Sequence, residues 1–261
     1  MEKVQKLIQS YTETEDASIF DQIRDLLRIE EGMFAVSVRI TNNFYMGTAN
    51  GKPAAFLFTC REYADAFVKE MKSVGVETKS LEIRPVQRIA FFNDLYRSGF
   101  EAVVIDKNQE KSLAMSLFNI IGKPEHDDKM VVNPELMCAA IRFYQGLASQ
   151  HVIKEMQDWV CSELFKARFI YPETTAHYST VAMLTDSKGR KFVPVFTDAV
   201  EFGKFDKKHH YQGKVVKFRD FKKLIGKADA IVVNPFGFGL KLDMEKIDRI
   251  AGENQKLKVV K

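Results

Sequence analysis

Hydrophobic and polar residues follow two periods along this chain, one typical of strands and one of helices. Extended runs on either side of Asn50-Gly51 indicate a two-residue hairpin, because both positions of such a turn take positive φ angles. Residues 60–71 then carry apolar side chains at helical spacing, and Thr59 directly before them suits an N-cap. The pattern predicts a hairpin followed by a helix that packs on it.

The second half of the chain repeats these signals in the same order. Residues 179–197 form an extended pattern around a turn at Ser187-Lys188-Gly189, and Thr197 is the expected N-cap of the next helix. Four further pairs of segments correspond between the halves: strands at 78–83 and 213–218, short glycine-ended helices at 86–99 and 218–226, buried central strands at 102–105 and 230–233, and closing helices at 109–122 and 243–252, which end at Gly122 and Gly252.

Two constant offsets relate the halves and favour a duplication. An offset of 138 maps Phe58-Thr59 onto Phe196-Thr197, and an offset of 128 maps the run AVVI (102–105) onto AIVV (230–233). The predicted fold class is therefore α/β (mixed α+β), with two tandem, duplicated domains that each hold a mixed β-sheet, a hairpin plus central strands, flanked by helices. We place the domains at residues 1–130 and 131–261.

A connector joins the two predicted domains. A polar stretch begins at Lys123, and Asn133-Pro134 then combines an N-cap with proline at the first helical position. The next residues predict either one long helix or two helices broken near residues 146–149. We assign this connector to the second domain.

Composition is that of an ordinary globular protein, with 46% hydrophobic and 28% charged residues. The net charge is only +4, yet residues 166–261 hold 20 Lys and Arg against 11 Asp and Glu. This asymmetry suits either steering of a partner or attraction between the halves, and scattered solvated lysines explain it as well. Three cysteines without metal-ligand spacing and an N-terminus without an apolar core indicate reduced thiols, no signal peptide and the cytoplasm.

The second copy resembles a known family at "FVPVFTDAVEF" and "ADAIVVNPFGFGLKLDMEKI". Over residues 168–251 it is similar to the enhanced-serine-sensitivity family, the SseB-type N-terminal domain. The matching positions are Pro194, Val195, Phe196, Thr197, Asn234, Pro235 and Leu242. The first copy keeps Phe58 and Thr59 but has Asp106-Lys107 where Asn234-Pro235 would stand, so it looks like a diverged copy. The resemblance implies cytoplasmic bacterial proteins without a defined enzymatic activity or cofactor, some of them interaction modules or immunity proteins against toxins.

No catalytic motif emerges from the sequence, so we expect no enzymatic activity, no metal and no cofactor. Phosphate loops, a nucleophile elbow and HExxH are all missing. His209-His210 and the stretch PEHDDK (124–129) are weak metal candidates, and a solvated loop and a linker are the preferred interpretations. Cys60 lies at a helix start, where the dipole lowers a thiol pKa, but a half-buried helix residue is the simpler interpretation.

Nucleic acid is an alternative partner for the basic second half, although no nucleic-acid motif accompanies the charges. The aromatic residues Phe202, Phe205, Phe218 and Phe221 lie between the lysines and fit either a stacking platform or, at helical spacing, a core. The basic residues concerned are Lys204, Lys207, Lys208, Lys214, Lys217, Arg219, Lys222, Lys223, Lys256, Lys258 and Lys261.

The stretch "IVVNPFGFGL" (231–240) supplies the candidate site. Asn234 tolerates unusual φ angles and Pro235 stops the strand ladder, so a strand-ending turn explains the stretch. Sites in open sheets also gather beyond the carboxyl ends of strands. The candidate partner-binding rim consists of Phe196, Thr197, Asn234, Pro235, Phe236, Gly237 and Phe238.

We therefore expect a cytoplasmic, non-enzymatic SseB-like protein whose partner is another protein and not a membrane. Binding of nucleic acid or of a small anionic ligand by the basic second domain, and action as an immunity protein, stay open as alternatives. An enzyme with a site built from dispersed residues is a third possibility.

Overall fold

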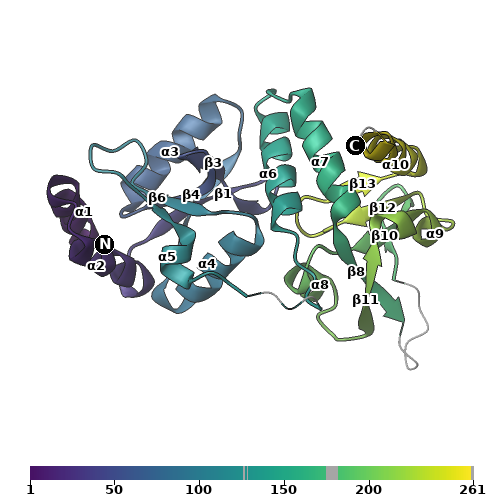
Figure 1. The fold of residues 1–261 in the computed structure, drawn as a ribbon, viewed down its shortest axis with the longest axis horizontal. Coiled ribbons are helices and arrows are strands. Elements are labelled where there is room, and N and C mark those ends of the chain that lie inside the picture. Colours follow the sequence, from purple (N-terminus) through teal and green to yellow (C-terminus); the bar gives the residue numbers. More distant parts are fainter. Residues whose placement is uncertain (126, 128, 175–181, 260–261) are drawn as a thin grey trace. The chain divides into compact units, whose positions relative to one another are not determined.

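The computed structural model describes residues 1–125, 127, 129–174 and 182–259, with side chains as far as Glu253 (Figure 1). The chain forms two compact units. Unit 1 comprises Met1–Glu125 and Tyr144–His151, and unit 2 comprises His126–Phe143 and Val152–Lys261. Each unit combines a sheet with helices, which confirms the predicted mixed α/β fold class.

Unit 1 is built on a seven-stranded mixed sheet with the order β2-β1-β4-β6-β7, to which β3 adds beside β4 and β5 beside β1. The strands are β1 (Phe34–Val38), β2 (Asn43–Phe44), β3 (Met46–Ala49), β4 (Lys52–Phe58), β5 (Thr78–Glu82), β6 (Ala102–Ile105) and β7 (Leu113–Ser116). The helices are α1 (Glu2–Thr14), α2 (Ala17–Ile29), α3 (Arg61–Ser73), the 3-10 turn η1 (Pro85–Gln87), α4 (Arg88–Arg97) and α5 (Leu117–Ile121).

The predicted hairpin of unit 1 is confirmed. Asn50 and Gly51 have φ angles of 50° and 76°, and they join β3 to β4 in antiparallel register. Gly47 on β3 is required by packing, because a Cβ there would come within 2.1 Å of the Phe56 ring. That ring lies against Phe67 of α3 at a centroid distance of 5.3 Å, so the helix covers the hairpin face of the sheet.

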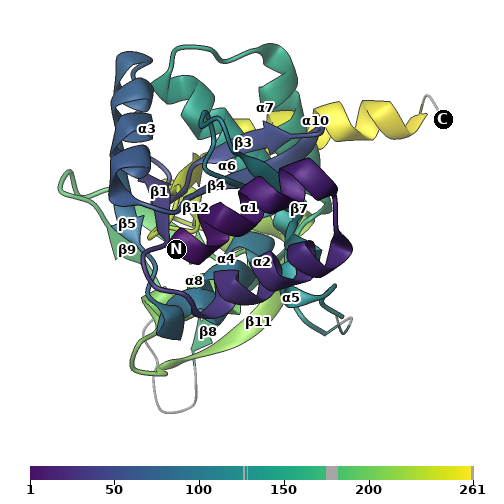
Figure 2. The same cartoon turned by 90° about the vertical axis from the view of Figure 1, so that its left-hand side faces the viewer.

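Helices α1 and α2 lie side by side as the two purple helices of Figure 2. The carboxyl end of α2 is fixed by the fully buried Arg88, the first residue of α4. Its guanidinium donates hydrogen bonds to the carbonyl oxygens of Leu27 (2.6 Å), Glu30 (2.7 Å) and Ile83 (2.6 Å). Burial lowers the pKa of Arg88 to about 10, so the group stays charged at neutral pH beside the negative end of the helix dipole.

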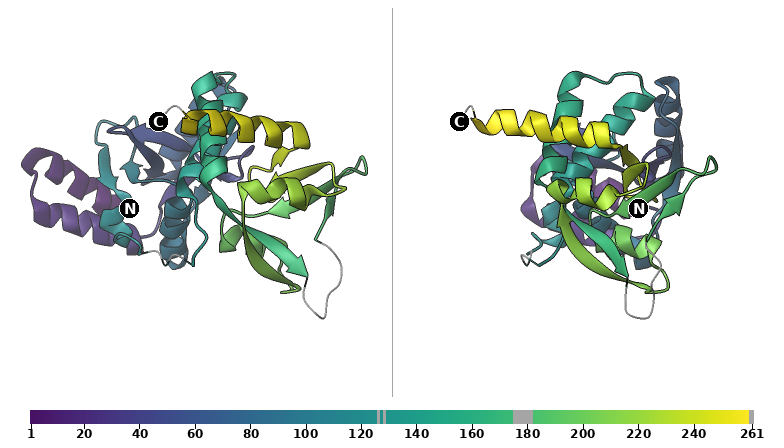
Figure 3. Two further views of the ribbon diagram at one scale, coloured as in Figure 1. Left: turned by 45° about the vertical axis from the view of Figure 1, so that its right-hand side comes forward. Right: turned by 90° about the vertical axis from the view of Figure 1, so that its right-hand side faces the viewer.

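Unit 2 holds a four-stranded sheet of order β13-β12-β10-β9 and a separate two-stranded ribbon of β11 and β8. Figure 3 shows this ribbon in green, and a bridge between Ile170 and Phe196 joins it to the end of β10. The strands are β8 (Arg168–Thr174), β9 (Leu184–Thr185), β10 (Lys191–Val195), β11 (Tyr211–Lys217), β12 (Ala230–Val233) and β13 (Leu240–Leu242). The helices are α6 (Pro134–Ala148), whose residues from Tyr144 onward belong to unit 1, α7 (Lys154–Lys166), α8 (Ala199–Phe205), η2 (Phe218–Asp220), α9 (Phe221–Ile225) and α10 (Met244–Val259).

The central parallel pair of each unit has the same register. In unit 1, β4 pairs with β6 from Ala54↔Ala102 onward. In unit 2, β10 pairs with β12 from Phe192↔Ala230 onward. The offsets between these partners are 138 and 128, the two values that the sequence comparison gave, so the duplicated pattern corresponds to a duplicated strand pairing.

Several sequence predictions of helix ends are wrong. The N-caps are Cys60 and Asp198 rather than the threonines, because Thr59 and Thr197 direct their hydroxyl groups to side chains at the end of the neighbouring strand. Residues 109–122 are not one helix, since Leu113–Ser116 pairs with β6 as a strand.

Of the other predictions for the connector and the second copy, some are confirmed and one is wrong. The closing helix α10 continues through Gly252 to Val259 rather than ending at the glycine. The connector forms two helices, α6 and α7, the broken form of the two predicted. The hairpin turn at Gly189 (φ 78°) is confirmed, although residues 179–181 of its first predicted strand lie outside the described residues.

Removing the Arg88 guanidinium is expected to destabilise unit 1. An Arg88→Met variant keeps most of the buried stem but leaves three carbonyl oxygens without their donor, so the free energy of unfolding should fall by about 3 kcal/mol. Hydrogen exchange of amides in β1 and β6 measures the loss. The control is Arg84→Ala at an exposed position of the same segment, where the change should stay within about 0.5 kcal/mol. Equal protection in Arg88→Met and the native chain would contradict this role.

Candidate functional site

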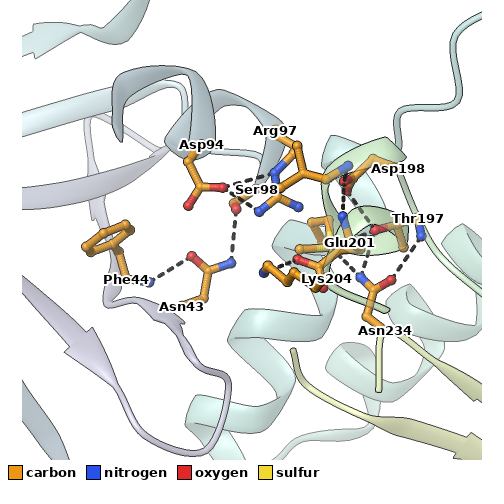
Figure 4. A network of polar contacts seen from close by, with 12 residues as sticks. Asn43, Phe44, Asp94, Arg97, Ser98, Thr197, Asp198, Glu201, Lys204 and Asn234 are labelled. Carbon is orange, nitrogen blue, oxygen red and sulfur yellow. Dashed lines mark hydrogen bonds and ion pairs between the residues drawn. The ribbon is translucent and has the colours of Figure 1, made fainter. Parts of the chain in front are cut away.

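The carboxyl ends of β10 and β12 meet at one edge of the unit 2 sheet, because the two strands are parallel. Asn234 follows β12 directly with a φ angle of 48°. Its Oδ1 accepts a hydrogen bond from the Thr197 amide (2.9 Å), and its Nδ2 donates one to Thr197 Oγ1 (2.7 Å), as Figure 4 shows. We call this pair of side-chain bonds between neighbouring strand ends the strand-end clamp.

Further polar contacts extend the strand-end clamp of unit 2. Thr197 Oγ1 donates to Asp198 Oδ2 at 3.0 Å, and Asp198 Oδ1 accepts from the amides of Val200 and Glu201, both at 2.9 Å, which caps α8. Asn133 donates to the carbonyl oxygen of Thr197 at 2.6 Å. Strand end, helix start and the beginning of α6 are thereby joined in one network.

The turn after Asn234 is tied back to the same residue. The amides of Gly237 and Gly239 both donate to the Asn234 carbonyl oxygen, at 2.9 and 3.1 Å, and Gly239 has a φ angle of 60°. The turn packs closely at Gly237, because a Cβ there would lie 3.3 Å from the carboxylate oxygen Oε2 of Glu201, a tight contact. Glu201 is itself buried and accepts a hydrogen bond from Lys204 (2.6 Å).

The seven residues of the predicted rim divide into a buried and an accessible group. Phe196, Thr197 and Asn234 are completely buried and Phe238 is 6% exposed, so these four support the turn from inside. Pro235 and Gly237 are partly exposed, whereas Phe236 at the tip is 44% exposed. The structure thus brings Phe196–Thr197 beside Asn234, as parallel strands require, and offers one large apolar side chain to the surface.

Unit 1 contains the same strand-end clamp with an acid in place of the amide. Asp106 follows β6 with a φ angle of 52°, and its carboxylate accepts from the Thr59 amide (2.8 Å) and from Thr59 Oγ1 (2.5 Å). Gln5 of α1 donates to Thr59 Oγ1 at 2.6 Å. Burial raises the pKa of Asp106 above its ordinary value, against the hydrogen bonds from Thr59 that lower it.

The network includes residues that the sequence patterns did not single out. Gln5 and Met137 occupy the same place in the two units, the fourth residue of α1 and of α6, and each contacts the clamp threonine. The sequence analysis also did not identify Asp198 and Glu201 as members of the network. The offset of 138 aligns Glu201 with Tyr63 of the first copy, but no local sequence pattern indicates that the Glu201 carboxylate is buried.

The weak catalytic candidates of the sequence were two possible metal sites and a cysteine at a helix start. Among the residues that the structure describes, no three His, Cys, Asp or Glu side chains lie close enough together to hold a metal ion. His126 and Asp128 of the PEHDDK stretch are not among the described residues. Burial raises the pKa of the Cys60 thiol, opposite to the lowering that a helix dipole alone predicts. Burial raises the pKa of Cys161 as well.

Basic residues of unit 2 are partly neutralised by acidic neighbours. Lys214 pairs with Glu173 at 2.6 Å, Lys222 with Asp248, and Lys204 with Glu201. Phe218 and Phe221 are buried and pack on each other at 5.2 Å, as core residues do. Lys256 and Lys258 fall in the part of α10 whose side chains are not described, and Lys261 lies outside the described residues. In the part of the chain searched, no helix has the length and apolar character needed to cross a bilayer.

Comparison with protein families confirms the resemblance of the second copy. Residues 148–249 match the SseB protein N-terminal domain, a range that contains the whole of α7 and extends into the first half of α10. The match therefore includes the whole strand-end clamp between Thr197 and Asn234, and begins 20 residues before the segment inferred from the motifs. A search of curated proteins found no match.

Two solved structures show weak similarity to the whole chain. Tic22 from Plasmodium falciparum is 11% identical over 92% of this chain and 98% of its own, with a TM-score of 0.21. Anabaena Tic22, described as a protein of protein transport, is 10% identical over 88% of this chain and 96% of its own, with a TM-score of 0.20.

The acid in the unit 1 clamp should make stability depend on pH. Because the pKa of Asp106 is raised in the folded state, its contribution is fully present at pH values below the unfolded pKa and is lost as pH rises through the folded pKa. Asp106→Asn, which copies the clamp of unit 2, should remove this loss. The measurement is the free energy of unfolding of both proteins between mildly acidic and neutral pH, and parallel pH profiles would contradict the assignment.

Proposed function

We propose that this protein acts without catalysis, by binding another protein through the turn Asn234–Gly239 of unit 2. The observation that supports the proposal most directly is the exposed ring of Phe236 on a turn whose base is completely buried. Aromatic side chains dominate the energetics of protein interfaces because they bury large area with few rotatable bonds. Phe236 is therefore the proposed contact residue, with Pro235 and Gly237 beside it.

Rigidity of the turn supports the same proposal. Asn234 is bonded to Thr197 through its side chain and to Gly237 and Gly239 through its carbonyl oxygen. A loop that is ordered before binding loses little conformational entropy when a partner docks. The match to the SseB protein N-terminal domain covers this turn, so the proposal concerns a feature inside the matched segment.

The cytoplasm is the compartment that we propose. Cys60, Cys138 and Cys161 are all free thiols, and the cytoplasm keeps thiols reduced. A partner would then meet the protein in a reducing environment, and recognition would rest on non-covalent contacts alone.

A photo-reactive phenylalanine analogue at position 236 tests the contact. The full-length protein carrying it is irradiated in cells of its source, and a discrete cross-linked protein is expected because the ring is proposed to lie in the interface. The matched control carries the analogue at Val215, which is 46% exposed in the same unit. Excess unlabelled native protein should compete the product away, whereas excess Phe236→Ser protein should not.

The competitor variant is suitable because its fold should be intact. Replacing this half-exposed ring removes buried apolar area and should lower the free energy of unfolding by about 1–2 kcal/mol. That is less than the total stability of a typical folded domain, and urea unfolding checks that the variant stays folded. Equal cross-linking from positions 236 and 215, or equal competition by both unlabelled proteins, would refute the proposed contact. Cross-linking to nucleic acid instead of protein would favour the alternative partner class.

A further inference from the structure

A cavity of about 420 Å³ opens in unit 1 where α1, α3 and the loop after β6 meet. Asp106 of the strand-end clamp lies in its lining, so the cavity stands at the carboxyl ends of the parallel strands β4 and β6. Crevices at this edge of an open sheet are common ligand sites, and the volume falls within the range of small-molecule pockets.

Polar groups line the cavity from three directions. Gln5, Lys6 and Gln9 come from α1 and Tyr63 comes from α3. The loop Asp106–Ser112 contributes its amide, carboxylate and amine side chains at positions 109–111. A lining of this kind suits a ligand rich in hydrogen-bonding groups rather than an apolar one.

The accessible charges of the cavity are mostly positive. Asp106 is 2% exposed and both its oxygens accept hydrogen bonds from Thr59, so it has little capacity left for a ligand. Lys6, Lys111 and Glu110 are exposed, and within the described residues neither lysine forms an ion pair. The lining holds two ammonium and two carboxylate groups in all, but Asp106 is buried, so a ligand meets the two ammonium groups and the Glu110 carboxylate. An anionic group is best placed between the two lysines.

Unit 2 provides an internal comparison at the same edge of its sheet. The positions that correspond to Gln5 and Gln9 hold Met137 and Ile141, which are 2% and 0% exposed. The turn after the clamp starts alike in both units, since the amide of Gln109 donates to the Asp106 carbonyl oxygen as Gly237 does to Asn234. The unit 2 turn then places the buried Phe238 where the longer loop of unit 1 carries polar residues. At this edge of the sheet, unit 2 is filled by apolar side chains, whereas unit 1 has an open cavity with a polar lining.

We propose that this cavity of unit 1 binds a small polar organic anion, with its carboxylate or phosphate group held by Lys6 and Lys111. Hydroxyl or amide groups of the ligand bond to Gln5, Gln9, Gln109 and Tyr63. This site is separate from the partner-binding turn of unit 2, so either proposal can fail without the other.

Amide NMR spectra of the full-length protein, recorded with four probes, test the site. L-malate supplies a carboxylate, glucose 6-phosphate and inorganic phosphate supply phosphate, and glucose supplies hydroxyl groups without charge. We expect saturable shifts of the amides of Gln5, Tyr63 and Gln109 with at least one anion, and no saturation with glucose. The anion that saturates identifies whether a carboxylate or a phosphate is preferred.

Two variants separate the cavity from general surface charge. The double variant Lys6→Gln/Lys111→Gln should weaken anion binding at least about tenfold through loss of charge-assisted hydrogen bonds. The control Lys69→Gln/Lys72→Gln makes the same charge change at exposed positions of α3 and should leave anion binding unchanged. Gln9→Trp fills the cavity without changing charge and should abolish binding. The proposal is overturned if no anion saturates at millimolar concentration, if glucose binds as well as the anions, or if Gln9→Trp binds normally.

Discussion

The hydrogen bonds between a threonine at the end of one parallel strand and an Asn or Asp at the end of its neighbour organise both units. In each unit the second residue adopts a positive φ angle, which turns the chain out of the sheet while its side chain reaches back to the threonine. Each bond contributes about 1 kcal/mol net, and an unpaired partner in these buried positions would cost more. The strand-end clamp therefore fixes where the sheet stops and where the following loop begins.

The loop directly after the clamp distinguishes the units. In unit 2 the short turn buries Phe238 and leaves Phe236 at the tip, which yields a closed edge with one projecting ring. In unit 1 a loop one residue longer leaves a polar cavity against α1. A common backbone arrangement thus supports two different surfaces, one that we propose binds a protein and one that we propose binds a small anion.

The sequence predicted those parts of the fold that depend on local pattern and on repetition. The hairpin at Asn50-Gly51, the central runs AVVI and AIVV, and the offsets between the copies all correspond to observed strands and registers. The threonines were misassigned as N-caps because Thr is a good cap locally. The side chains that bond their hydroxyl groups instead, the acceptor Asp106 and the donor Asn234, lie 47 and 37 residues away. Likewise, the residues of β7 were predicted as part of a helix, because their local pattern does not show that they pair with β6 as a strand.

The candidate site was predictable only in outline. Parallel strands brought Phe196–Thr197 beside Asn234 as the motif order suggested, but the sequence could not tell which of Phe236 and Phe238 faces inward. The cavity of unit 1 escaped notice because its lining comes from segments far apart in the chain, among them Gln5 and Gln109. Such convergence depends on how α1 packs, which no local pattern encodes.

A double-mutant cycle between Thr197 and Asn234 tests the organising role of the strand-end clamp most directly. Thr197→Val removes the hydroxyl group, and Asn234→Gly removes the amide while keeping a residue that tolerates the positive φ angle. From the free energies of unfolding of the native, single and double variants, we expect a coupling energy of about 1–2 kcal/mol. Strictly additive losses, with a coupling energy near zero, would contradict the claim that these two side chains hold the strand ends together.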